Sequence, residues 1–119
     1  MRAEQRAKQL LESDGVIVYA PGQHTGPCKE AYTVVHCYGN YQTVQSTRLS
    51  YTLLLVHCYA PLDGTQTETL ATLAERVKRV MQGMKSQAKP TGREEPDMIE
   101  SEYRALSRTI EYQILKSNC

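Results

Sequence analysis

Tryptophan and phenylalanine are both missing from this sequence, and its aromatic content consists of eight tyrosines. A tyrosine side chain combines an apolar ring with a polar hydroxyl group. It therefore suits positions that are half buried or that lie in contacts between proteins. The aromatic composition indicates a chain with an extensive contact surface.

Long hydrophobic runs and an excess of charge of one sign are missing as well. The longest apolar run, LLLV at 53–56, has the length of a buried strand and is far shorter than the roughly 18 residues that a membrane span needs. No apolar stretch follows the charged first eight residues, so we expect no signal peptide and a protein made and kept in the cytoplasm. The formal net charge of +1, with acids and bases interleaved, predicts no membrane partner and no specific nucleic-acid partner.

The chain length and the apolar pattern predict one α+β domain over residues 1–119. The expected elements are, in chain order, a helix at 2–13, strands at 16–19, 30–38 and 49–59, a helix at 65–84, and one or two strands within 98–116. Strands joined as consecutive hairpins form an antiparallel sheet. We therefore expect a small antiparallel sheet of four to five strands with both helices packed on one face, in the order α-β-β-β-α-β-β.

Two connections are long and polar for so small a domain. Residues 39–48 are expected to form a hairpin connection, and residues 85–97, with Gly92 and two prolines, an exposed and mobile loop. Between them, Thr65 and Glu68 have the spacing of a capping box, which predicts the start of the second helix.

A repeated tetrapeptide, VHCY at 35–38 and again at 56–59, is the first candidate for chemistry. Two histidines with two cysteines are the ligand set of a structural zinc site. Neighbouring residues on a strand point to opposite faces, and the expected hairpin separates the two tetrapeptides by about five residues, or roughly 16 Å. We therefore expect no metal site.

A cysteine nucleophile is the second candidate. Cys37 and Cys58 lie in strands that read as buried, where a thiol is inert, whereas Cys28 lies in a loop four residues after His24. The lack of a signal peptide argues against a disulfide framework, so reduced thiols are expected in the core. No glycine pattern for binding phosphate is present, and the carboxylates near residue 95 are expected to form a solvated turn. We predict that the protein is not an enzyme and has no cofactor.

Three segments resemble a known family. They are the strand entry KEAYTVV at 29–35, the run YTLLLV at 51–56 with the helix that follows it, and the closing RTIEYQILK at 108–116. Together with the element order, they resemble the tail-terminator or tail-completion proteins, the head–tail joining proteins of tailed bacteriophages and of phage-tail-like bacteriocins. The resemblance spans most of the chain and lies more in topology than in a diagnostic motif.

The resemblance implies a structural virion protein that is made in the bacterial host cytoplasm and then resides in the virion tail. It would form a homo-oligomeric ring, typically a hexamer, that caps the tail tube and joins it to the neck or head. Its partners would be further copies of itself, the tail tube and possibly the sheath protein, and a neck or connector protein. By this analogy, docking is expected on 39–48 and 85–97, through Tyr38, Tyr41, Arg48, Lys85, Lys89 and Arg93.

Three alternatives remain open at this stage. The chain could be a head–tail joining or neck protein, a generic small α+β binding module that is not viral, or a small cysteine- or metal-dependent enzyme. The basic cluster around Lys78 and Arg79 fits an acidic partner or simply a soluble helix face.

Overall fold

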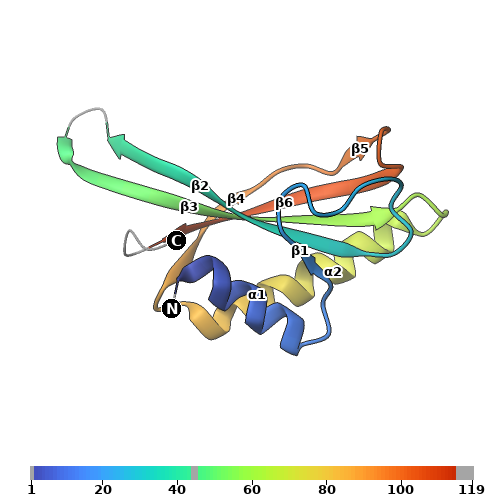
Figure 1. Ribbon diagram of the computed structural model, residues 1–119, viewed down its shortest axis with the longest axis horizontal. Helices are drawn as coiled ribbons and strands as arrows, with labels where there is room; N and C mark the ends of the chain where they lie inside the picture. Colours follow the sequence, from blue (N-terminus) through green and yellow to red (C-terminus); the bar gives the residue numbers. More distant parts are fainter. Residues whose placement is uncertain (1, 44–45, 115–119) are drawn as a thin grey trace.

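A computed structural model describes residues 2–43 and 46–114, with side chains for residues 2–37 and 52–114. The elements, in chain order, are α1 (Ala3–Ser13), β1 (Val18–Tyr19), β2 (Tyr32–Thr43), β3 (Ser46–Pro61), α2 (Gln66–Met81), the 3₁₀ turn η1 (Gln82–Met84), β4 (Ala88–Glu94), β5 (Met98–Glu100) and β6 (Ala105–Ile114). The α+β class and the order of helices and strands expected from the sequence are confirmed (Figure 1).

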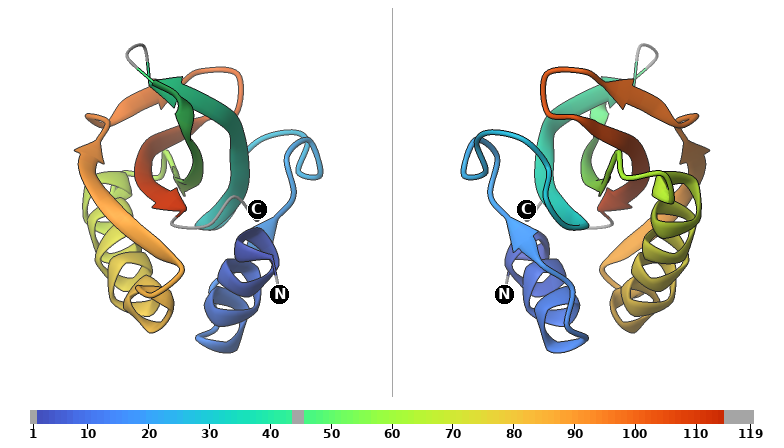
Figure 2. Two further views of the ribbon diagram at one scale, coloured as in Figure 1. Left: turned by 90° about the vertical axis from the view of Figure 1, so that its left-hand side faces the viewer. Right: turned by 90° about the vertical axis from the view of Figure 1, so that its right-hand side faces the viewer.

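The strands form one mixed sheet of six, in the order β1-β2-β3-β6-β4, with β5 paired to β6 as well. All pairs are antiparallel except β1 with β2, which run parallel. Both helices lie on the same side of this strongly twisted sheet, as expected (Figures 1 and 2).

The core lies between the helices and the sheet. Strand β3 is central, and its alternate residues Leu54, Val56 and Cys58 are fully buried toward the helices. Helix α2 packs on β3, whereas α1 packs on β2 and α2, with the small buried residues Ala3 and Ala7 on its inner face letting its backbone approach closely. This period-2 burial on β3 is the pattern of a strand covered on one face by helices.

Helix α2 follows the predicted apolar stripe, but its start differs from the predicted capping box. The Thr65 side chain makes no cap bond to the helix. Its hydroxyl group instead donates to Asp63 Oδ1 at 2.8 Å, and the same oxygen accepts the Thr65 backbone N–H. An Asp two residues upstream offers a stronger, charged acceptor, and it holds Thr65 in the preceding turn.

The segment expected to be a loop, 85–97, instead contains the strand β4. Ala88, the first residue of β4, is buried, and the other residues of this strand are exposed. Pro90 lacks a backbone N–H, which is tolerated on an edge strand or beside a bulge. A strand exposed on both faces has the polar composition of a loop, and only the pairing with β6 distinguishes the two.

The hairpin of β2 and β3 extends well beyond the rest of the sheet (Figure 1). The connection expected at 39–48 is mostly strand, because β2 runs to Thr43 and β3 begins at Ser46. Residues of β3 from Thr52 onward pair with β6, whereas among residues 2–43 and 46–114 the partners of residues 46–51 lie on β2 alone. We call this distal two-stranded part, residues 40–43 with 46–51, the arm.

Candidate functional site

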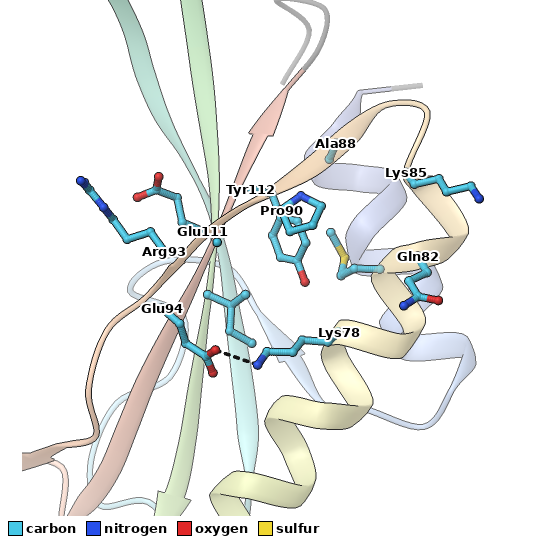
Figure 3. Close-up of a pocket in the computed structure, with 12 residues that line it drawn as sticks. Lys78, Gln82, Lys85, Ala88, Pro90, Arg93, Glu94, Glu111 and Tyr112 are labelled. Carbon is cyan, nitrogen blue, oxygen red and sulfur yellow. Dashed lines mark hydrogen bonds and ion pairs between the residues drawn. The ribbon is translucent and has the colours of Figure 1, made fainter.

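A groove lies between α2 and β4, with β6 beneath it (Figure 3). Its volume is about 300 Å³. Its apolar lining comes from Met81 on α2, Pro90 on β4, and Ile110 and Tyr112 on β6. Burial raises the pKa of the Tyr112 phenol, so this side chain is neutral at physiological pH. We call this feature the α2–β4 groove.

The groove opens where β4 is irregular. Pro90 pairs with Tyr112 and Glu94 with Ile110, so three residues of β4 lie opposite one residue of β6. Gly92, at the centre of this bulge, has φ +82°, a left-handed conformation that strongly favours glycine. A bulge bends its strand away from regular pairing. The sequence TGR at 91–93 therefore shapes the mouth of the groove.

The charges around the groove are partly paired. Lys78 on α2 points across it and donates to Glu94 Oε2 at 2.7 Å (Figure 3). Arg108 also binds Glu94, at 3.3 Å, and is held by Asp97 through two hydrogen bonds of 2.7 and 3.2 Å. The Asp97 bond raises the pKa of the Arg108 guanidinium further. Glu94 is thus neutralised by two cations.

Two further cations stand at the mouth of the groove. Lys85 and Arg93 line it from opposite sides, and their side chains extend away from its centre (Figure 3). Within the described ranges, 2–37 and 52–114, neither has an ion-pair partner. Glu111 also lines the groove, beside Arg93 (Figure 3). The groove therefore combines an apolar interior with a rim on which three cations, Lys78, Lys85 and Arg93, outnumber the carboxylates Glu94 and Glu111.

The structure brings together two of the six residues expected to make contacts. Lys85 and Arg93 share the groove, whereas Lys89 pairs with Gln113 and so belongs to the opposite face of the sheet. Tyr38, Tyr41 and Arg48 lie on β2 and β3, and their side chains are outside the described part of the chain.

Sequence reasoning missed Lys78, Tyr112 and Pro90 as lining residues. Lys78 was recognised only as part of a basic helix face. No local signal pairs residue 90 with residue 112, because that contact depends on which strand β4 joins. The Pro-x-Gly spacing of Pro90 and Gly92 was the available sign of an irregular edge strand.

The histidines of the repeated tetrapeptide lie closer together than expected. His36 pairs with Leu55, and His57 with Val34, so the two histidines are diagonal neighbours on one face rather than five residues apart. The expected register was shifted by about three residues, because the hairpin turns later and has irregularities after Tyr38 and Gln42. The alternation argument holds, since Cys37 pairs with Leu54, whose side chain is buried on the other face.

The face of the sheet that carries His36 and His57, opposite the helices, also carries an aromatic cluster and a cavity of about 260 Å³. His24 stacks on Tyr32 at 4.3 Å between ring centroids, and Tyr32 stacks on Tyr59 at 4.9 Å. His36 and His57 line the same cavity. Among the residues that the structure describes, no three His, Cys, Asp or Glu side chains lie close enough to hold a metal ion.

The thiols are poorly placed for nucleophilic chemistry. Cys28, expected in an accessible loop, is buried, and its Sγ atom donates to the Glu30 carbonyl oxygen at 3.2 Å. Burial raises the pKa of the Cys28 thiol, and it raises that of Cys58 to about 12. Because the thiolate is the nucleophile, these raised pKa values make both thiols poor nucleophiles at neutral pH. Cys37 differs from the expected reduced state, since it is disulfide-bonded.

Comparison with known proteins adds no assignment. No protein-family model matches the chain, and no curated protein or solved structure matches it. Within the described residues, neither helix has the length and apolar character needed to cross a membrane.

Proposed function

We propose that this chain is a structural virion protein, a tail terminator that forms a ring on the tail tube and joins it to the neck or head. The observation that carries the proposal is the arm. Within the part of the chain that the structure describes, the two strands of the arm pair only with each other. An isolated two-stranded ribbon is marginally stable in water. The arm is therefore suited to packing against another protein.

The edges of the sheet support assembly with further copies of the chain. Strand β1 pairs with only two residues of β2, and β4 and β5 have no outer neighbour among the described strands. Open strand edges bind other strands and surfaces. Because the two edges differ, contact between them is head to tail, and head-to-tail contacts close into rings when the rotation allows.

The burial of the two free thiols favours a structural role over catalysis by a cysteine. Cys28 and Cys58 are buried with raised pKa values. The rim cations Lys85 and Arg93 of the α2–β4 groove are instead exposed, as residues that bind proteins are. The expected partners are the tail tube, possibly a sheath protein, and a neck protein.

The test is a native mass measurement combined with a tube-capping assay. Light scattering at several concentrations should show growth toward about 80 kDa, the mass of six 13.4 kDa chains. Adding the protein to growing tubes from its own phage or phage-tail-like particle should stop their elongation, as seen by electron microscopy. Tubes that keep elongating in an excess of the protein would exclude a terminator. Binding to completed heads or necks without any effect on tube length would favour the joining-protein alternative.

A further inference from the structure

Strand β5 exposes large apolar side chains at the edge of the sheet. Met98 is 51% exposed and Ile99 is 66% exposed, the two largest values among the exposed large hydrophobic residues that the structure describes. Within the described residues, β5 pairs only with β6, so its outer edge has no strand beside it. Edge strands of soluble proteins are usually covered or charged. Exposed apolar residues at such an edge mark a binding surface.

The residues around this apolar pair are acidic. Glu95, Asp97, Glu100 and Glu102 surround it, and we call residues 95–102 the β5 segment. Asp97 is bound by Arg108, and Glu100 Oε1 accepts the Ser107 hydroxyl at 3.1 Å. Glu95 and Glu102 are exposed and have no ion-pair partner in the part of the chain whose side chains are described. The segment thus presents apolar side chains flanked by negative charge.

The α2–β4 groove has the complementary character. Its interior is lined by Met81, Ile110 and Tyr112, and its rim carries Lys85 and Arg93, which have no ion-pair partner among residues 2–37 and 52–114. A volume of about 300 Å³ is sufficient for one or two apolar side chains, since a complete small-molecule pocket starts at about that size. An apolar group flanked by carboxylates is the ligand that such a groove selects.

The β5 segment cannot occupy the groove of its own chain. Strand β5 is held on β6 opposite residues 105–107, whereas the groove lies beside residues 110–112 of the same strand. Only three residues separate Glu94, at the groove, from Met98. If β5 moved into the groove, it would lose its pairing with β6. The β5 segment is therefore available to a second molecule.

We propose that the α2–β4 groove of one copy receives the β5 segment of the next copy. This inference rests on the proposed ring and names the contact that builds it. The groove and the segment are different surfaces, so the contact is head to tail and is repeated at every subunit. Because neighbouring strand residues point to opposite faces, one of Met98 and Ile99 enters the groove and the other packs at its edge. Lys85 and Arg93 face Glu95 and Glu102.

The experiment uses two charge-reversed variants of the full chain, followed by sedimentation and light scattering. Lys85→Glu with Arg93→Glu alters the groove, and Glu95→Lys with Glu102→Lys alters the segment. Each variant alone should need at least about tenfold more protein to assemble, because like charges then meet across the contact. An equimolar mixture of the two should assemble at close to the wild-type concentration, since each altered surface finds its opposite in alternate subunits.

The control is Arg6→Glu with Lys8→Glu, which changes the net charge by the same amount and in the same direction as the groove variant, at exposed positions on α1. It should assemble like the wild type, and circular dichroism should show that all variants fold. Assembly that is unaffected by either charge reversal, or that stays lost in the mixture, would overturn the proposed contact. So would a wild-type chain that remains monomeric in both the presence and the absence of tubes. Tube capping by the wild type is scored separately, so a ring that caps tubes but ignores the substitutions rejects this contact and leaves the proposed function standing.

Discussion

At the scale of one residue, His57 lies on the face of the sheet opposite the helices, and its surroundings there lower its pKa. Its Nδ1 atom lies 2.8 Å from the Thr109 hydroxyl oxygen. Burial is the main cause that lowers the pKa of His57, and neighbouring His36 lowers it further, while Glu95 and Glu100 act in the opposite direction. His57 is therefore harder to protonate in the folded chain than in the unfolded chain.

The first prediction concerns stability against pH. As the pH falls toward 6.5, the ordinary pKa of a histidine, the unfolded chain binds a proton at residue 57 before the folded chain does. The free energy of unfolding should therefore fall between pH 7.5 and 5.5, and this part of the fall should disappear in His57→Gln. Urea unfolding of both proteins at three pH values measures the difference. Equal slopes for the two proteins would contradict the assignment to His57.

At the scale of secondary-structure elements, Arg76 on α2 links that helix to the end of α1 through hydrogen bonds. Arg76 on α2 donates through Nε to Asp14 Oδ2 at 2.6 Å, and through Nη2 to the Asp14 carbonyl oxygen. Asp14 follows the end of α1, where the carbonyl groups lack helical partners. Gly15 is next, with φ +87°, and a Cβ atom there would lie 3.1 Å from Arg76 Nη2. The end of α1 and this arginine therefore fit each other closely.

Replacing Arg76 by alanine should lower the free energy of unfolding by about 1 kcal/mol, which lowers the melting temperature by several degrees. A value below the usual range for a charged hydrogen bond applies because both side chains are about 40% exposed and solvent screens the pair. Thermal unfolding measures the change. Arg79→Ala, an exposed arginine on the same helix, is the matched control and should change stability by less than about half as much. A similar loss in both variants would mean that the Asp14 contacts contribute nothing specific.

At the scale of the whole molecule, the arm is the most prominent feature. The molecule measures 47 Å along its longest axis and 30 and 24 Å along the others. The arm lies at one end of the long axis, away from both helices (Figure 1). Among the residues whose side chains are described, the hydrophobic core extends as far as Ile114, which pairs with Thr52 of β3. Folding and docking should therefore depend on different parts of the chain.

Replacing residues 41–51 by a two-residue Asn-Gly turn tests whether folding and docking depend on different parts of the chain. Asn40 and Thr52 are paired across the hairpin, so a two-residue turn can connect them. The shortened protein should keep its circular dichroism spectrum and unfold within a few degrees of the wild type, yet fail to cap tubes. Tyr41→Ala with Arg48→Ala in the full-length arm tests the two expected contact residues without shortening it. Tube capping by the shortened protein would place the docking surface elsewhere.

Local patterns in the sequence determined the helices, the central strands and the fold class. The stripe of Leu70, Leu73 and Val77 requires a helix with one buried face, and the alternation along β3 requires a strand covered on one side. These patterns repeat within a few residues, so the chain carries them without reference to distant partners. The buried state of Cys58 also follows from such a pattern.

Only the tertiary structure decided the identity of β4, the register of the hairpin and the α2–β4 groove. Strand β4 is exposed and polar, and it is a strand because β6 offers hydrogen bonds to it about twenty residues later in the chain. The neighbouring positions of His36 and His57 depend on where the hairpin turns and on irregular pairing after Tyr38. Pairing between distant segments leaves little trace in local composition, because the backbone groups that make the pairs are the same in every residue except proline.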